Sequence, residues 1–412
     1  MTNDLIKLAW RNIWRNKRRT FITIGAIAFA VFLASFMRSF QKGVWDTVID
    51  GAVNQFFGYV QIHGNGYWED QAIDNSIAYD GDLQTLAQKV NLVEDVVPRI
   101  ESFALASSGN LTSGVLVLGI DPEKENGLTK VADKLVEGNY LTASDNAVLV
   151  ASGLSDKLGL GLGDTLVIIS QGYHGVNAAG KYPIKGIFKF GLPDLNKRLI
   201  ILPLATAATF YGAEGRVTTL ALKIADRKDV PATVAAVKNN LIPIEKYEVM
   251  EWPELIPELV EARQLDEAGG VIVLGILYLL ITFAIFGTIL MMTKERSYEF
   301  GVLTAIGMRR GKLFGVIWLE TIIVAIIGVL LGILMSIPIV YYFHIHPIDM
   351  AVFGEEAVVA YEKMGIQSTL STAFEFGVFF NQALVILMVT SLLAIYPLVT
   401  IMKLKPVEAM RG

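Results

Sequence analysis

Four long stretches of this chain carry no charged side chain: residues 20–37, 268–293, 321–343 and 376–402. The shortest of them, 20–37, would extend roughly 27 Å as a helix, close to the roughly 30 Å hydrocarbon core of a bilayer. Buried helices of soluble proteins seldom stay uncharged for so long, because their outer faces meet water. The pattern therefore predicts four transmembrane helices.

The segment between the first two stretches, 56–253, has a different pattern of short runs. Alternating and β-branched runs predict strands at 59–63, 113–120, 147–150, 165–170, 182–188, 199–202 and 218–224. Helical spacing predicts helices at 83–90, 154–158, 204–211 and 230–241, with turns such as Gly163-Asp164 between elements. This mixture predicts a large α+β domain between the first and second spans.

Helical spacing also continues beyond the first span to Ala52 and precedes the second span from Leu255, which predicts two helical stalks. The predicted organisation divides the chain into nine parts. They are an amphipathic helix (1–19), first span and stalk (20–55), α+β domain (56–253), second stalk and span (254–293), loop (294–312), third span (313–343), second loop (344–375), fourth span (376–402) and tail (403–412).

Charge sets the expected orientation. Basic residues gather in the first segment, in the 294–312 loop and in the tail, whereas loop 344–375 has Lys363 against five acids. The positive-inside rule then places both termini and the 294–312 loop in the cytoplasm and the α+β domain outside. A hydrophobic content of 53% with 18% charged residues excludes an ordinary soluble enzyme, and no basic, aromatic-interleaved patch suggests nucleic acid. Without cysteine, the chain has neither disulfides nor thiolate metal sites.

The first segment has Ile6, Ala9 and Ile13 on one helical face and arginines on another. With Trp10 and Trp14 at headgroup level, the pattern favours an amphipathic helix on the inner leaflet over one packed on the bundle. A basic stretch before an apolar run also imitates a signal peptide. Because no small-x-small cleavage site follows, we expect the run to be retained as a span.

The 294–312 loop is a short charged interruption between two long apolar runs. Within it, Phe300, Leu303 and Gly307 share one helical face, and Gly307 is placed to end the helix. A small amphipathic helix on the cytosolic side indicates a docking site for another protein.

Four motifs carry a resemblance to a known family. Glu299-Phe300-Gly301 with the downstream Ile306-Gly307 resembles the coupling-helix loop of FtsX-like ABC transporter permeases, a group that contains the lipoprotein-releasing (Lol-type) and macrolide-exporter (MacB-type) membrane subunits. The stretch RNIWRNKRRT (11–20) resembles the entry motif of that group, and AVLVASGLSDKLGLGLGDTLV (147–167) resembles its extracytoplasmic core. Tyr396-Pro397 and the tail sequence KPVEA (405–409) also fit, so the resemblance covers most of the chain.

The resemblance implies a separate ATPase partner. The chain has no G-x-x-x-x-G-K-[ST] motif, since the run 307–312 is one residue short and is followed by Leu313. We therefore expect no cofactor and no catalytic residue on this chain, with ATP and Mg²⁺ held by the partner ATPase. Arg296 and Glu299 would make polar contacts to it, while Phe300 and Leu303 would fill a groove. The full set expected to couple to the ATPase is Arg296, Glu299, Phe300, Gly301, Leu303, Ala305, Gly307 and Arg309.

Within the spans, small residues are candidates for helix packing, and one acidic residue is a candidate for a buried charge. Gly328 and Gly332 form a G-x-x-x-G that lets helix backbones approach closely, and one or both are candidates to face a second permease subunit. Glu320 lies about two turns inside the third span, where an unpaired charge is costly. Two alternatives stay open: Glu320 sits at the inner interface near Lys312 or Arg296, or it anchors the coupling loop, as the resemblance suggests.

The leading hypothesis for function, given by the resemblance, is extraction of lipoproteins from the inner membrane by mechanical transmission. A pair of permeases, identical or homologous, would work with two ATPases, membrane lipid and a periplasmic carrier or adaptor recruited near residues 171–181. The acyl chains would lie in an apolar cavity, although its side chains equally suit lipid contact or bundle packing. These candidates are Phe29, Phe32, Leu33, Phe36, Ile276, Leu279 and Phe283.

Two rival functions remain open: a regulator of a periplasmic partner such as a cell-wall hydrolase, and a MacB-like exporter of peptides or small molecules. An enzyme is the least favoured class, because no Ser/His/Asp set or carboxylate pair has defensible spacing. His344 and His346 favour solvated loop histidines over a metal site.

Overall fold

A computed structural model describes residues 2–15, 17–241, 244–356, 358–359 and 369–403. It forms two compact units. The helical unit comprises Met1–Asp46, Ala262–Asp349 and Thr369–Gly412, and the α/β unit comprises Thr47–Glu261 and Met350–Ser368. Each unit is described by itself.

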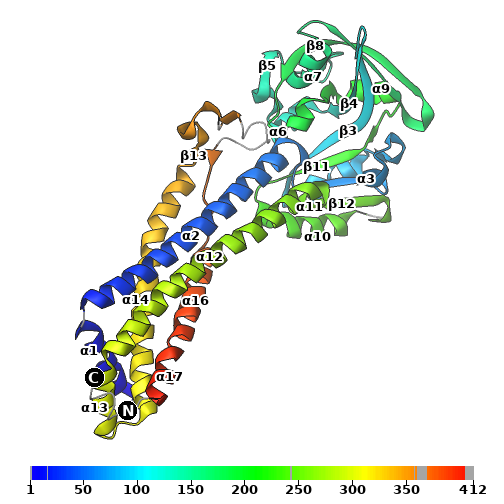
Figure 1. The fold of residues 1–412 in the computed structure, drawn as a ribbon. Coiled ribbons are helices and arrows are strands. Elements are labelled where there is room, and N and C mark those ends of the chain that lie inside the picture. The colour runs from blue at the N-terminus through cyan, green and yellow to red at the C-terminus, as the bar shows by residue number, and fades with distance from the viewer. Residues whose placement is uncertain (1, 16, 242–243, 357, 360–368, 404–412) are drawn as a thin grey trace. The chain divides into compact units, whose positions relative to one another are not determined.

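The helical unit is built on four long apolar helices, so the four predicted spans are confirmed as candidate membrane spans by length and composition. Figure 1 shows α2, α12, α14 and α16 running side by side, with α1, α13 and α17 at one end of the bundle. The helices are α1 (Thr2–Arg15), α2 (Lys17–Ala52), α12 (Pro257–Glu295), α13 (Ser297–Ala305), α14 (Arg310–Ile345), α16 (Phe376–Leu393) and α17 (Ile395–Lys403). A short strand pair, β13 (Ile348–Asp349) and β14 (Thr369–Leu370), belongs to the same unit.

The core of the bundle joins all four long helices. Buried side chains from α2, α12, α14 and α16 form one cluster, because apolar residues at helical spacing face one another across the bundle. The cluster comprises Ile27, Ala30, Val31, Ile285, Ile289, Ala325, Val329, Ala383 and Ile386.

Gly328 and Gly332 bring α14 against α2. A Cβ at Gly328 would lie 2.8 Å from the Cβ of Ile27, and one at Gly332 would lie 2.6 Å from the carbonyl oxygen of Ala28. The predicted close approach is therefore confirmed. Its partner is a helix of the same chain, which corrects the expectation that these glycines face a second subunit.

The N-terminal helix α1 packs on the bundle. Ala9 and Ile13 are buried, and Ile13 clusters with Ile24 of α2 and Val324 of α14. The bundle-packed alternative thus describes one face of α1. Trp10 and Trp14 remain exposed on the helix, where they suit the headgroup region of a membrane.

The α/β unit is organised around a ten-stranded, mostly antiparallel sheet with the order β12-β1-β11-β3-β4-β9-β6-β8-β5, in which β7 pairs with β3 and β8. The pairs β4–β9 and β6–β8 are parallel. The strands are β1 (Val60–Gly64), β3 (Val93–Ser108), β4 (Leu111–Ile120), β5 (Leu135–Gly138), β6 (Val148–Ala151), β7 (Thr165–Gln171), β8 (Asn177–Phe188), β9 (Leu199–Pro203), β11 (Thr219–Ile224) and β12 (Tyr247–Glu251). A small separate pair joins β2 (Ile77–Ala78) to β10 (Arg216–Val217).

Short helices cover this sheet (Figure 1). They are α3 (Tyr67–Asp70), α4 (Gly81–Gln84), α5 (Leu86–Lys89), α6 (Pro122–Thr129), α7 (Ser152–Leu158), α8 (Pro193–Asn196), α9 (Leu204–Tyr211), α10 (Val230–Asn240) and α11 (Trp252–Leu255). All seven predicted strands and the helices at 154–158, 204–211 and 230–241 are confirmed. The helix predicted at 83–90 is instead two short helices, because the backbone leaves the helical conformation at Thr85.

The most important missed element is β3, which pairs with β4, β7 and β11 at the centre of the sheet. Its sequence contains Glu94, Asp95, Pro98, Arg99 and Glu101, which hide the strand alternation. Tertiary pairing on both sides overrides that local composition.

We predict that Gly332→Ala destabilises the protein while Gly275→Ala does not. The new methyl at position 332 would overlap α2, at a cost of about 1–3 kcal/mol. At Gly275 a Cβ meets open space, and alanine gains helix propensity. Thermal unfolding of the detergent-solubilised chain compares them. Equal unfolding temperatures for the two variants would contradict the close packing of α14 on α2.

Candidate functional site

Six charged side chains meet at one end of the helical unit and form an arginine–glutamate cluster. They come from α1, the N-terminal end of α2, the C-terminal end of α12, α13 with its N-cap, and α14. The members are Arg15, Arg19, Glu295, Arg296, Glu299 and Glu320.

Glu320 is the buried centre of this cluster. Its residue is only 3% exposed, yet it is ionisable and lies within α14. Arg296 donates from Nη1 to Glu320 Oε2 at 2.7 Å, and Arg19 Nη2 lies 3.8 Å from Oε1. A carboxylate out of water needs such partners, because desolvation would otherwise cost several kcal/mol. The contact with Arg296 ties Glu320 to the 294–312 loop.

Arg296 links Glu320 to the coupling loop. Its Nε donates to Glu299 Oε2 at 3.2 Å, and its guanidinium carbon lies 5.4 Å from the centre of the Phe300 ring. One planar guanidinium therefore contacts two carboxylates and an aromatic face at once, a geometry that lysine cannot match. Arg296 is also the N-cap residue of α13, although its side chain makes no capping hydrogen bond and is turned instead to the two carboxylates.

Two further pairs attach the N-terminal helices. Arg15 of α1 donates to Glu299, and Arg19 of α2 lies 3.5 Å from Glu295 at the end of α12. The hydrogen bond from Arg15, helped by Arg296, holds the pKa of Glu299 below its usual range. Glu299 is thus ionised at neutral pH. Its stabilising contact is present above the unfolded-state pKa and is lost as pH falls through the lowered pKa.

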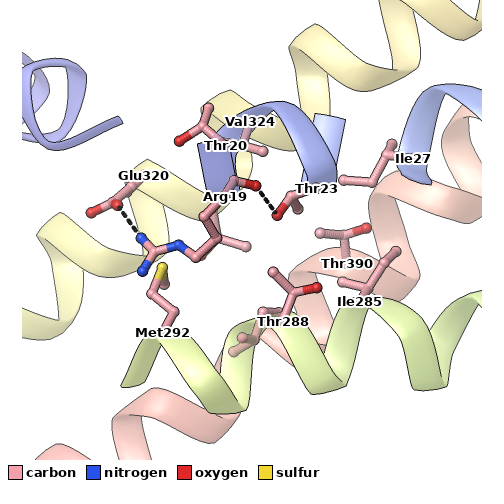
Figure 2. Close-up of a pocket in the computed structure, with 12 residues that line it drawn as sticks. Arg19, Thr20, Thr23, Ile27, Ile285, Thr288, Met292, Glu320, Val324 and Thr390 are labelled. Atoms are coloured by element: carbon pink, nitrogen blue, oxygen red, sulfur yellow. Dashed lines mark hydrogen bonds and ion pairs between the residues drawn. The ribbon is translucent and has the colours of Figure 1, made fainter. Parts of the chain in front are cut away.

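A small cavity lies beside the Arg19–Glu320 contact, as Figure 2 shows. Its volume is about 30 Å³, room for a single water molecule. Threonines from four helices line it, and Thr23, Thr288, Thr321 and Thr390 each donate to a carbonyl oxygen four residues earlier in their own helix. Because these hydroxyls are already satisfied by their helices, they make the wall polar without competing for Glu320.

Phe300 faces inward from α13. Its ring is fully buried in a cluster with Met292, Leu313, Ile317 and Ile401. This corrects the expectation that Phe300 fills a groove on the ATPase, because the ring instead anchors α13 to the bundle. Leu303 packs partly against the same cluster.

The other predicted coupling residues divide between the two faces of α13. Gly301 is buried, whereas Ala305, Gly307 and Arg309 are exposed. The helix ends at Ala305, and the predicted stop residue Gly307 follows the C-cap with a φ of +100°, which L-residues rarely adopt. Two large apolar side chains that the prediction did not include, Tyr298 and Ile306, are 58% and 80% exposed.

The predicted cargo-cavity residues lie on the outside of this chain or half-buried within it. Phe29, Ile276, Leu279 and Phe283 are between 54% and 64% exposed. Phe32 and Phe36 are half-buried, and Phe36 stacks on Phe40 and meets Phe343 of α14. These residues form an apolar surface, and their cargo role stays a prediction.

The sequence reasoning missed Arg15, Arg19 and Glu295 as members of the site. It used these arginines only as a measure of membrane orientation. A signal was available: Arg15 and Arg19 are four residues apart, and Glu295 and Glu299 are four residues apart, so each pair can share a helical face. The tail motif 405–409 and Arg411 lie outside the described residues.

In the parts of the chain that the structure describes, no group of three or more His, Cys, Asp or Glu side chains could hold a metal ion. His344 lies in the last turn of α14, and its Nδ1 lies 2.7 Å from the carbonyl oxygen of Thr372.

Comparison with known proteins agrees with this architecture. Residues 20–240 match the profile of the MacB-like periplasmic core domain, and residues 271–406 match that of the FtsX-like permease C-terminal. The chain therefore belongs to the FtsX-like, MacB/Lol-type superfamily of ABC transporter permeases and is a multi-pass membrane protein.

Particular relatives are distant. The lipoprotein-releasing system transmembrane protein LolC of Neisseria meningitidis is 22% identical over 327 residues, which cover 77% of this chain and 74% of LolC. The macrolide export ATP-binding/permease protein MacB of Nitrobacter winogradskyi is 23% identical over 78% of this chain, but only 50% of that relative is covered. Among solved structures, the periplasmic region of MacB from Actinobacillus actinomycetemcomitans aligns with 52% of this chain at 16% identity and a TM-score of 0.37.

We predict that Glu320→Gln lowers the free energy of unfolding by about 3–5 kcal/mol, since it leaves a buried arginine charge unpaired. Glu295→Gln is the control, because its side chain is 46% exposed and its pair should contribute at most about 1 kcal/mol. The double variant Arg296→Gln/Glu320→Gln should recover part of the loss, because it removes both charges of the buried pair. Thermal or denaturant unfolding measures all three, and a fully additive double variant would show that the two charges are not coupled.

Proposed function

We propose that this chain is the membrane subunit of an ABC transporter whose separate ATPase docks on α13, with ATP and Mg²⁺ on that partner. The observation that carries the proposal is the arginine–glutamate cluster. Its charges pair α13 and its N-cap directly with α1 and α14, and Arg19 of α2 extends the cluster to α14 and α12 at the same end of the bundle. A short helix held this firmly on one face while exposing large apolar side chains on the other suits a mechanical contact.

The two faces of α13 have separate roles in this proposal. Tyr298 and Ile306 face outward and bind the ATPase, while Phe300 and Arg296 face inward and pack on the bundle. Closure of the ATPases would move α13, and the buried Arg296–Glu320 pair would pass that movement to α14. Arg19 and Arg15 would carry it to α2 and α1.

The proposed orientation places both termini and α13 in the cytoplasm of a bacterium and the α/β unit outside its inner membrane. The basic residues of the first segment and of the 294–312 loop support this through the positive-inside rule. In sequence, α2 leads into the α/β unit and α12 leads out of it, and both helices are unbroken over 36 and 39 residues. These continuous helices would transmit the movement as levers.

For the cargo, we propose lipoproteins extracted from the membrane by a pair of such permeases and passed to a periplasmic carrier. The alignment over most of LolC supports this choice. The exposed apolar side chains Phe29, Ile276, Leu279 and Phe283 would contact the acyl chains. A second candidate is export of a peptide or small molecule through an adaptor, which the likeness to MacB of Nitrobacter winogradskyi favours.

We predict that Ile306→Glu abolishes co-purification of an ATPase with the detergent-solubilised chain. Ile306 is 80% exposed, so the substitution removes no internal packing while placing a charge in the proposed interface. Val352→Glu is the matched control, because Val352 is also 80% exposed but lies in the loop between α14 and α16. Mass spectrometry identifies the partner. An ATPase retained equally by both variants would place the docking surface elsewhere, and none with the native chain would end the transporter proposal.

We also predict ATP-dependent release of a palmitoylated lipoprotein from proteoliposomes that contain this chain with its co-purified partners. Phe283→Asn should reduce release several-fold without abolishing ATP hydrolysis. Phe380→Asn should leave release unchanged, since Phe283 and Phe380 are 64% and 65% exposed and differ in the helix that carries them. Normal hydrolysis with no lipoprotein in the soluble fraction would favour the export candidate instead.

A further inference from the structure

The α/β unit contains a cavity of about 360 Å³ that the transport proposal does not use. This volume falls in the range of small-molecule sites. Six elements contribute its wall: the turn after α2, α3, β3, β4, α8 and the segment from α11 to the start of α12. Five of the fourteen lining residues are aromatic, and the charged residues among the lining are Glu101, Glu258 and Arg198.

Two of the aromatic lining residues, Tyr67 and Trp68, are held in place by contacts with residues around them. The rings of Tyr67 and Trp68 line the cavity, and the buried His63 ring stacks on Tyr67 with centroids 5.2 Å apart. The Tyr67 hydroxyl donates to the backbone oxygen of Glu101 at 2.7 Å, so its polar end is satisfied. Glu248 accepts from the backbone N–H of Gly66 at 2.6 Å and holds the turn before these rings. The wall is therefore built before any ligand arrives.

Two unusual backbone conformations occur among the lining residues. Phe56 and Phe57 enter the cavity from a π-helical turn, Val53–Phe57, a conformation that is rare and often marks functional sites. Gln71 lines the cavity from a left-handed backbone with φ of +48°, which few residues other than glycine adopt. Such conformations persist only where the surrounding structure requires them.

The lining also contains a buried carboxylate, Glu101, which has one long contact to an arginine. Arg99 is fully buried and gives a two-pronged pair to Glu125, from Nε at 2.8 Å and Nη2 at 2.7 Å. Its third contact, Nη1 to Glu101 Oε1, is longer at 3.4 Å. One arginine thus serves two buried carboxylates, and its contact with Glu101 is the longest of the three. Burial raises the pKa of Glu101, and Arg99 opposes that effect.

We propose that this cavity binds an organic cation, with its ammonium group against Glu101 and its apolar body between Trp68, Tyr67 and Phe103. A cation would be attracted by the carboxylate of Glu101, which has only one long contact to Arg99, and by the aromatic faces of the lining. An anionic ligand would bring its charge toward Glu101. Arg198, the positively charged lining residue, is exposed at the rim, where water screens it.

The test titrates the purified full chain, in a nonionic detergent, with benzyltrimethylammonium by isothermal titration calorimetry. Benzyl alcohol and benzoate serve as neutral and anionic counterparts of similar size. We expect saturable binding of the ammonium compound, at least tenfold tighter than either counterpart. The titration needs no ATPase and no ATP, so its outcome is independent of the transport proposal.

Glu101→Gln should weaken binding of the ammonium compound at least tenfold and leave benzyl alcohol unaffected. The variant keeps the Arg99–Glu125 pair, so the fold should survive, which its unfolding temperature checks. Trp68→Leu, in the half-buried aromatic wall, should weaken binding independently of the acid. Glu94→Gln is the matched control on the same strand, since Glu94 is 46% exposed and pairs with Lys223.

Three results would overturn the proposal. The first is benzoate or benzyl alcohol binding as tightly as the ammonium compound. The second is the same affinity in Glu101→Gln as in the native chain. The third is no heat of binding with any probe up to about 10 mM, a concentration at which a site with a millimolar dissociation constant would be largely filled.

Discussion

The buried ion pair between Arg296 and Glu320 is the interaction on which the helical unit depends. Glu320 lies inside an apolar helix, and arginines from two other segments reach its carboxylate, which offsets the cost of taking it out of water. Since removing either partner strands a charge, the pair couples the position of α13 to that of α14 more strictly than apolar packing would. A contact of this kind resists being pulled apart, which is what a helix that transmits force requires.

Packing around that pair shows how the bundle keeps its elements in register. The ring of Phe300 fixes one face of α13, and Gly328 and Gly332 let α2 lie directly on α14. Small residues where α2 crosses α14 avoid overlap, and large residues beneath α13 avoid voids. Both are needed because protein interiors are close-packed. The same chain therefore supplies close contact where helices must hold and an exposed apolar surface where a partner would bind.

The α/β unit also contains buried charges, which pair at the centre of its sheet. Arg99 and Glu101 are two residues apart on β3 and thus share one face, and Glu125 arrives from α6. On a linear sequence, these charges suggest a solvated loop, so the longest strand of the sheet was not predicted. Its assignment depends on pairing with β4, the next strand along the chain, and with β11, which becomes a neighbour only after folding.

The sequence by itself determined the four apolar helices, the alternation of strands and helices between the first two, and the stop of α13 just before Gly307. Hydrophobic periodicity and glycine conformation are local properties, so no partner is needed to recognise them. Only the tertiary structure decided that Phe300 faces inward, that Gly328 packs on α2, and that Arg15 and Arg19 meet Glu299 and Glu320. Those outcomes follow from contacts between segments as far apart as 284 residues, and burial of a charge can be judged only when all of its neighbours are in place.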